Sequence, residues 1–409
     1  EVVRWKRPRW GGLCPSASRQ TMVYQNGNGR GRLTDTLASP EFKSAVLLYK
    51  YQGPDLSLLE RLFLEDWWDY LAQHVYPAWL APNLITLMGG ACVIASLALC
   101  FTFSPGLAGE SPGWVYVLCA ALLFSYQSLD GSDGKQARKT KSGSALGELM
   151  DHGLDAFVVA PICVFTIDAV GFGWSSGWFW TITCGGQWAF ALSNMTLLMC
   201  GKMSVNLFDV MELQTAMMVI LCVNATWGTQ VFATPVTVYG SVYELRDLMA
   251  MGSVGGLAVS LGRNLHQILG KTSTEVPDPQ LPQIFAGLLS FNLIGYLSLR
   301  RAREMDGADG LHAMRMLLLC GSFCFAEAMA RMLVLRLGWL RLPAVPRSVG
   351  CITLFRVALE IGGYAPAAAV AIAAVFELTF FVRACRAIAA ALEIHPFKVR
   401  GAKHWNKLA

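Results

Sequence analysis

Charged residues are scarce in this sequence. Asp, Glu, Lys and Arg together make up 15% of the 409 residues, whereas hydrophobic residues make up 54%. With a mean hydropathy of +0.43, the chain is too apolar for the water-exposed surface of an ordinary globular protein. The net charge of +5 is modest and the basic residues lie in short connecting stretches, which disfavours a nucleic-acid-binding face. This composition indicates an integral membrane protein.

Cysteine motifs and a secretion signal are also missing. None of the twelve cysteines has CxxC spacing, and most lie within apolar runs, as Cys92, Cys100 and Cys119 do. Neither structural zinc nor a disulfide framework is therefore expected. The first forty residues contain Gly, Arg and Ser but no apolar run of the signal-peptide kind. We expect residues 1–44 to form a disordered N-terminal arm.

Long apolar runs are abundant in the rest of the chain. A hydrocarbon core about 30 Å thick requires roughly 20 apolar residues for each helical span. The runs predict an all-α fold, a polytopic transmembrane helical bundle with about ten spans. The two weakest are 248–262, which is short and Gly-rich, and 348–364, which contains Arg356 and Glu360. The predicted spans are 82–104, 113–129, 155–172, 176–200, 214–234, 248–262, 283–299, 313–336, 348–364 and 366–385.

Residues 45–80 precede the first span and mix apolar and charged residues at helical spacing. They include Trp67, Trp68 and Tyr70, which favours an amphipathic N-terminal helix in the membrane interface. A helix packed on the protein's own surface is the alternative. The connector between the second and third spans is basic, which predicts that it faces the cytoplasm. It carries Lys135, Arg138, Lys139 and Lys141.

Acidic residues are concentrated in one stretch beside two predicted spans. Carboxylates near a membrane span are costly unless they are paired or bind a metal. Spacings of three, four and seven residues place them on one face of each of two helices, which could present them to a common centre. Their repulsion favours oxygen-preferring divalent cations such as Mg²⁺ or Mn²⁺. The predicted metal ligands are Asp130, Asp133, Asp151 and Asp155.

Neighbouring residues point to phosphoryl chemistry, for which two divalent ions are suited because they bind a pyrophosphate and favour in-line displacement. Gly134 and Gly147 leave room for a ligand or a neighbouring backbone, and Arg138 can hold a phosphate. His152, close to Glu148, is a candidate catalytic residue. The alternatives are a transporter's ion or proton site, glycines that serve helix packing, a topology charge at Arg138 and a structural His152.

At these residues the sequence resembles the CDP-alcohol phosphatidyltransferase family. The family signature is D-x2-D-G-x2-A-R followed, after eight residues, by G-x3-D-x3-D. The chain matches every fixed position, through Asp130, Asp133, Gly134, Ala137, Arg138, Gly147, Asp151 and Asp155. It is also similar to the eukaryotic choline/ethanolaminephosphotransferase branch over roughly residues 45–400, in the stretches 79–86, 126–138, 146–155, 209–214 and, more faintly, 383–400.

This resemblance implies transfer of phosphocholine or phosphoethanolamine from CDP-choline or CDP-ethanolamine to diacylglycerol, with release of CMP. This is the last step of phosphatidylcholine or phosphatidylethanolamine synthesis. It implies two Mg²⁺ (or Mn²⁺) ions on the four aspartates, His152 as the proton acceptor and Glu148 as the fallback base. It also implies ten spans, a homodimer, and a place in the endoplasmic reticulum (or Golgi) with the active site facing the cytoplasm. The predicted substrate-binding residues are Asn83, Gly134, Arg138, Gly147 and Glu148.

The resemblance also suggests how the chain is divided into regions, but it does not decide between the possible substrates. We expect a catalytic transmembrane core at 81–236, further transmembrane helices at 237–390 and a basic tail at 391–409. Asn194-Met195 stands where the branch usually has a His-Trp pair, which weakens any cation–π argument for choline. The alternative functions are a CDP-diacylglycerol-dependent phosphatidyl transferase, and a cation-binding transporter or inactive homologue.

Overall fold

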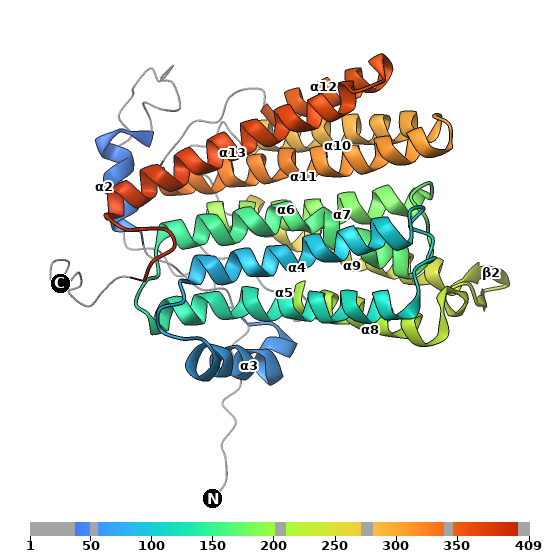
Figure 1. Cartoon of the computed structure of the whole chain (residues 1–409), viewed down its shortest axis with the longest axis horizontal. Helices are drawn as coiled ribbons and strands as arrows, with labels where there is room; N and C mark the ends of the chain where they lie inside the picture. The colour runs from blue at the N-terminus through green and yellow to red at the C-terminus, as the bar shows by residue number, and fades with distance from the viewer. Residues whose placement is uncertain (1–36, 50–55, 201–209, 271–280, 339–346, 400–409) are drawn as a thin grey trace, which may run out of the picture.

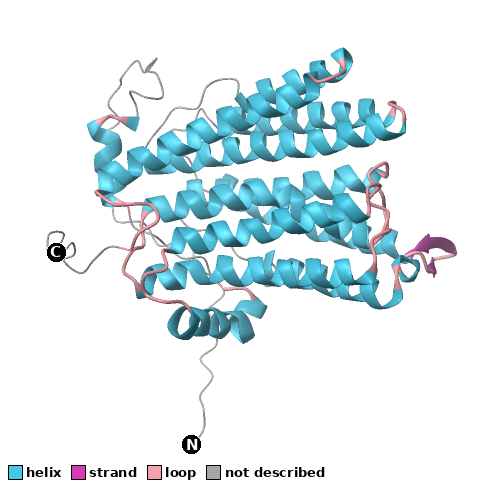
Figure 2. Cartoon of the chain, viewed as in Figure 1, coloured by secondary structure: helices cyan, strands magenta, loops and turns pink. Residues whose placement is uncertain are grey.

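The computed structural model describes residues 37–49, 56–200, 210–270, 281–338 and 347–399. Within these ranges the chain forms helices joined by short loops, together with one β-hairpin (Figure 2). The helices are α2 (Pro40–Leu48), α3 (Glu65–Tyr70), α4 (Pro82–Phe103), α5 (Gly113–Lys139), α6 (Ala145–Ala169), α7 (Gly177–Cys200), α8 (Val210–Trp227), α9 (Leu245–Gly270), α10 (Leu281–Arg303), α11 (Gly307–Gly338), α12 (Arg347–Ile361) and α13 (Ala365–Leu392).

Each predicted span overlaps its own helix, in order from α4 to α13. Among the described residues, six helices are long and apolar enough to cross a membrane. The all-α membrane fold is therefore confirmed, whereas ten spans remain a prediction. The helices α9 and α12, which contain the two weakest predicted spans, are not among the six. Those six are Pro82–Phe103, Ala145–Ala169, Val210–Trp227, Pro282–Arg303, Gly307–Leu335 and Ala365–Leu392.

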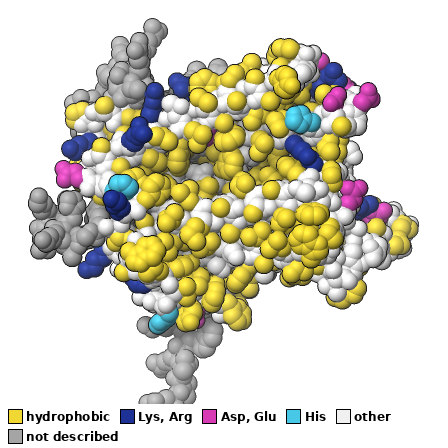
Figure 3. Space-filling view, in the orientation of Figure 1, with side chains coloured by type: hydrophobic (Ala, Val, Ile, Leu, Met, Phe, Trp, Pro, Cys, Tyr) yellow, Lys and Arg dark blue, Asp and Glu magenta, His cyan; other side chains and the backbone are white. Residues whose placement is uncertain are grey.

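The long helices lie side by side along a common direction (Figure 1). On the face shown in Figure 3, hydrophobic side chains cover most of the area, and charged side chains gather towards the two ends of the helices. An apolar band between charged ends is the pattern that a bilayer requires. Helix α11 lies inside the bundle, where it packs against α6, α7, α12 and α13.

The two helices that carry the acidic residues are longer than the predicted spans. The predicted span 113–129 ends one residue before Asp130. The predicted span 155–172 begins at Asp155, the last of the four aspartates. In the structure, α5 continues to Lys139 and α6 begins at Ala145, so the acidic residues are all helical. Ser144 caps α6, because its hydroxyl accepts a hydrogen bond of 3.3 Å from the N–H of the third helical residue. The predicted helical faces are thus realised.

The prediction that four basic residues lie in the connector between the second and third spans was partly wrong. Lys135, Arg138 and Lys139 lie on the last turns of α5, and Lys141 is the residue of the four that lies in the loop. The Lys139 ammonium donates hydrogen bonds of 2.6 Å to the carbonyl of Ala72 and 2.7 Å to that of Tyr76. A basic side chain at a helix C-terminus is favourable because it faces the negative end of the helix dipole.

Residues 58–75 form one continuous helical segment, in which α3 is flanked by π-helical turns at Glu60–Leu64 and Leu71–Val75. The segment packs on α5. Trp68 is buried there, and the Lys135 ammonium pairs with two carboxylates of the segment at 2.8 and 3.1 Å. Leu62 and Phe63, by contrast, are exposed. The helix therefore packs on the protein with one face and presents apolar side chains on another, as an interfacial helix does.

A small β-hairpin was not predicted. Strands β1 (Pro235–Val238) and β2 (Ser241–Glu244) pair antiparallel, joined by Tyr239 and Gly240 with φ of 48° and 81°. Positive φ at both positions is what a two-residue hairpin turn of the favoured hand needs. The predicted span 214–234 is accordingly too long at its C-terminal end, since α8 ends at Trp227.

The boundary of the N-terminal arm also differs from the prediction. Helix α2 begins at Pro40, within the range expected to be disordered, and Ser39 caps it by accepting a hydrogen bond of 3.1 Å from the N–H of Phe42. Phe42 and Val46 are buried in a cluster with residues of α6, α11 and α13. Residues 1–36 and 400–409 lie outside the described residues, and the remaining domain boundaries stay predictions.

Replacing Gly131 with Ala should loosen the helical segment on α5. An added Cβ would lie 2.1 Å from the Trp68 ring, so the ring or the helix must shift, and such overpacking costs typically about 1–3 kcal/mol. We expect a lower thermal unfolding midpoint in detergent and faster proteolysis within residues 58–75. Gly256→Ala on α9, where the added carbon would meet no described residue within 4 Å, is the control. Equal behaviour of the two variants would contradict the docking role of Gly131.

Candidate active site

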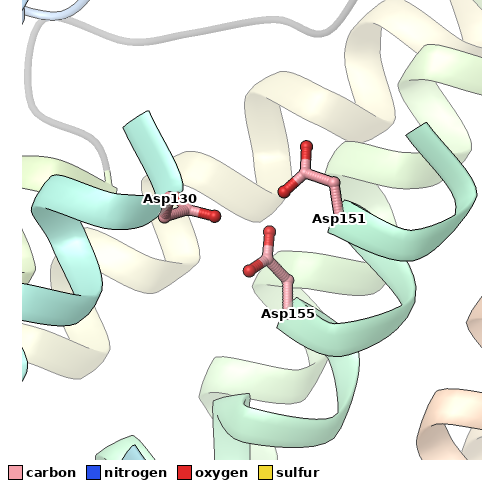
Figure 4. A group of neighbouring side chains, drawn as sticks. All are labelled: Asp130, Asp151 and Asp155. Carbon is pink, nitrogen blue, oxygen red and sulfur yellow. The ribbon is translucent and has the colours of Figure 1, made fainter. Parts of the chain in front are cut away.

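Three carboxylates meet in the second half of α5 and the first half of α6, towards the end of the bundle where α5 terminates. Asp130 projects from α5, while Asp151 and Asp155 project one turn apart from α6 (Figure 4). One carboxylate oxygen from each residue lies within 4.8 Å of those of the other two. Like charges this close need a proton or a cation to compensate them. An all-oxygen donor set of this kind fits Mg²⁺ or Mn²⁺.

Asp133, the fourth predicted ligand, lies beside this group rather than in it. Its side chain is buried, and it accepts a hydrogen bond from the hydroxyl of Thr86 on α4. It is close enough to Asp130 and Asp155 for the charges to interact. The structure thus brings three of the four aspartates together and holds the fourth next to them. Thr86 was not singled out from the sequence, because only the fold places α4 against α5.

Tyr126 supports the carboxylate group from α5. Its buried hydroxyl donates a hydrogen bond of 2.6 Å to Oδ1 of Asp155. This bond crosses from α5 to α6 and ties the two acidic helices together. Tyr126 precedes Asp130 by four residues, a spacing that places both side chains on the same face of α5 and from which this role could have been predicted.

A second hydrogen-bonded chain fixes α5 between Asp130 and Asp133. The Ser132 hydroxyl donates a hydrogen bond of 2.5 Å to the Ser128 carbonyl. Because the Ser132 hydrogen is used there, the Tyr76 hydroxyl, 2.8 Å away, donates to Ser132 Oγ. Tyr76 lies outside the membrane-spanning segments, and its burial raises the pKa of its phenol. The phenol therefore stays protonated at neutral pH and keeps its donor role.

Asn83, expected to contact the substrate, lies at the start of α4 beside the start of α6. A Cβ built on Gly147 would have Asn83 Oδ1 as its nearest neighbour, at 3.7 Å. The Asn83 amide nitrogen donates a hydrogen bond of 2.7 Å to the carbonyl of Pro396. The segment after α13 therefore covers Asn83, although 313 positions separate the two residues in the sequence. Nothing in the local sequence pattern predicts this contact.

The signature glycines occupy open positions. Among the residues that the structure describes, a Cβ on Gly134 would meet only the Arg138 guanidinium at 3.7 Å, and the position of Gly147 is equally roomy. Both distances are ordinary van der Waals contacts, so neither glycine is needed for close helix packing. Gly131, which lies against Trp68, is the packing glycine of this stretch. This contrast favours ligand access over helix packing as the reason for Gly134 and Gly147.

The two candidate bases lie on the same helix as two of the aspartates. Glu148 is buried in the first turn of α6, and His152 follows Asp151 directly. The His152 Nδ1 atom lies 3.0 Å from Oδ1 of Asn194 on α7. Arg138 is exposed at the end of α5. The position of Arg138 leaves both predicted roles open, as a phosphate ligand and as a topology charge.

Comparison with known proteins agrees with this site. The family model described as CDP-alcohol phosphatidyltransferase matches residues 79–243, which contain all four aspartates. Cholinephosphotransferase 1 of Gallus gallus is 37% identical over 237 residues, which is 57% of this chain and 68% of the relative. The chain belongs to the CDP-alcohol phosphatidyltransferase family. Cholinephosphotransferase 1 of Danio rerio is 33% identical over 261 residues, covering 61% of this chain and 67% of that protein.

The similarity does not extend over whole proteins. Cholinephosphotransferase 1 of Homo sapiens is 32% identical over 247 residues, which is 59% of this chain. The chain spans about 60% of the length of this family member and of the one from Xenopus laevis. Family membership, which the signature predicted, is therefore confirmed, and the reaction itself is a matter for proposal. Asp209, in one of the resembling stretches, lies outside the described residues.

Replacing Asp151 with Asn should abolish stabilisation by divalent cations. In the wild-type protein a bound cation relieves carboxylate repulsion, and at 100 times the dissociation constant it stabilises the fold by about 2.7 kcal/mol. We expect Mn²⁺ to raise the unfolding midpoint of the wild type and to leave that of Asp151→Asn unchanged. Asp66→Asn, at an exposed acid of α3, is the matched control and should keep the full shift. A full shift in Asp151→Asn would exclude Asp151 as a ligand.

Replacing Tyr126 with Phe should weaken Mn²⁺ binding without unfolding the protein. The variant loses the hydrogen bond to Asp155 but keeps the buried ring. Loss of a partner that orients a metal ligand typically lowers affinity about 10- to 100-fold. Titration followed by Mn²⁺ electron paramagnetic resonance measures this effect. Tyr296→Phe, at a half-exposed tyrosine of α10, is the control, and equal affinities in the two variants would show that Tyr126 has no such role.

Proposed function

We propose that the protein transfers phosphocholine or phosphoethanolamine from CDP-choline or CDP-ethanolamine to the hydroxyl of diacylglycerol, releasing CMP. The carboxylate group of Asp130, Asp151 and Asp155 carries the proposal, because such a group in an apolar bundle suits cation-assisted phosphoryl transfer. Relatives named cholinephosphotransferase 1 support an amino-alcohol donor. The product would be phosphatidylcholine or phosphatidylethanolamine.

The donor would bind where α4, α5 and α6 meet. Two Mg²⁺ or Mn²⁺ ions held by the four aspartates would neutralise the pyrophosphate and the departing phosphate of CMP. The open positions of Gly134 and Gly147 leave space for the pyrophosphate next to the carboxylates. The residues that we assign to the donor are Asn83, Gly134, Arg138, Gly147 and Glu148.

His152 is the proposed catalytic base, with Glu148 as the fallback. His152 removes the proton from the diacylglycerol hydroxyl, whose oxygen forms a bond to the β-phosphorus of the donor. The bond between that phosphorus and the oxygen bridging to the α-phosphate breaks, and CMP leaves with the electron pair. His152 interacts electrostatically with Asp155, so the proton would be taken up close to the carboxylates.

The position of the site near one end of the bundle suits two substrates of different solubility. The water-soluble donor can approach from the end where α5 terminates in basic residues, and the lipid acceptor can enter from the bilayer. By the positive-inside tendency this end faces the cytoplasm. An endoplasmic reticulum membrane and a homodimer belong to the same proposal and rest on the family resemblance.

Purified protein in diacylglycerol-containing micelles should release CMP from CDP-choline or CDP-ethanolamine when Mg²⁺ is present. Release should stop with EDTA and fall by at least about 100-fold in Asp151→Ala, because a transition-state charge loses its stabilisation. Asp66→Ala should retain wild-type turnover. The measurement is chromatographic quantification of CMP, with CDP-diacylglycerol as a third donor.

The other outcomes separate the competing functions. Turnover only with CDP-diacylglycerol and a polar alcohol would identify a phosphatidyl transferase instead. Absence of CMP release with every donor, in a folded protein that still binds Mn²⁺, would favour a cation-binding transporter or an inactive homologue.

A further inference from the structure

A buried amide on α7 faces the candidate base. Asn194 is only 2% exposed, and its Oδ1 atom lies 3.0 Å from Nδ1 of His152 on α6. In the sequence this asparagine stands out as a departure from the pattern of similar enzymes. The contact joins two long helices next to the carboxylate group, so it bears directly on how the imidazole ring is held.

The orientation of the Asn194 amide is fixed by a second hydrogen bond. Its Nδ2 atom donates to the carbonyl of Phe190 at 3.0 Å, one turn earlier on α7. The nitrogen is thereby committed to the helix backbone, and the oxygen must be the atom that faces His152. An amide oxygen has no hydrogen to give, so His152 Nδ1 carries the proton. In the neutral ring, Nε2 then holds the lone pair.

The bond to the backbone is not specific to this position. Asn264 on α9 and Asn292 on α10 are buried and also donate to the carbonyl four residues earlier, at 3.1 and 3.0 Å. The three asparagines differ in what their oxygens face. Asn264 Oδ1 accepts a hydrogen bond from Thr196, and Asn292 Oδ1 has no hydrogen-bond partner in the part of the chain that the structure describes. The oxygen of Asn194 therefore has a distinct role.

We infer that Asn194 is a positioning residue for His152: it holds the ring in one orientation and keeps the proton on Nδ1, so that Nε2 can accept the proton of the acceptor hydroxyl. The inference rests on the proposed function for the part played by Nε2. The positioning itself depends only on the two hydrogen bonds of Asn194. A partner that sets the tautomer of a functional histidine is a common feature of active sites.

Turnover tests the role in catalysis. Asn194→Leu keeps the shape of the side chain and removes the acceptor, so kcat should fall about 10- to 100-fold while KM for the CDP-alcohol changes little. Asn194→Asp retains an acceptor oxygen but loses the bond to the Phe190 carbonyl, so its kcat should lie between those of Asn194→Leu and the wild type. Asn292→Leu makes the same change at a buried asparagine with the same backbone bond and should behave as the wild type. Equal kcat in Asn194→Leu and Asn292→Leu would overturn the inference.

The tautomer can be measured without any substrate. The chain has six histidines, so ¹⁵N-histidine labelling gives a tractable spectrum in which His152→Gln identifies the signal of His152. At a pH where the ring is neutral, we expect the proton on Nδ1 in the wild type and in Asn292→Leu, and a mixture of tautomers in Asn194→Leu. A proton on Nε2 in the wild type, or no change in Asn194→Leu, would overturn the positioning role. The tautomer can be established even if the protein turns over no CDP-alcohol. Absence of turnover would contradict the proposed function and not the positioning role of Asn194.

Discussion

The close approach of several carboxylates inside an apolar bundle is the constraint on which the rest of this structure depends. Asp130, Asp151 and Asp155 repel one another, since they are only partly exposed and the apolar helices around them leave little water to screen their charges. The bundle tolerates them because neighbouring side chains supply hydrogen-bond donors. Tyr126 donates to one carboxylate, and Thr86 donates to the adjoining Asp133. The arrangement therefore suits a cation-binding site better than an apolar protein core.

Rigid support and open space alternate along the same short stretch of α5. Gly131 allows the Trp68 ring to lie directly on the helix, which anchors the segment before α4. Gly134, three residues later, faces no such neighbour in the described part of the chain, and it follows Asp133 directly in the sequence. These two glycines therefore have opposite roles: Gly131 permits close packing of a side chain, and Gly134 leaves space beside the helix. A substrate with a bulky pyrophosphate needs both a fixed frame and room beside it.

Much of this could be read from the sequence, and the failures have a common cause. The apolar runs, the helical faces of the aspartates and the family signature depend on local spacing, which a single sequence displays directly. The boundaries of α5 and α6 were missed because charged residues ended the apolar runs before the helices ended. Thr86, Asn194 and Pro396 were missed as partners because they reach the site from other elements. Such contacts depend on how helices pack, for which one sequence gives no pattern.

The same dependence on packing makes the C-terminal helices part of the site. The family match ends at residue 243, yet α6 packs extensively against α11, which lies beyond it. A Cβ on Gly153 of α6 would lie 2.6 Å from the ring of Phe381 on α13. Pro396, further along, accepts the hydrogen bond of Asn83. The helix that carries Asp151 and His152 is therefore held from one side by the matched region and from the other by the later helices. Differences between relatives in those later helices can then change the site without altering any residue of the signature.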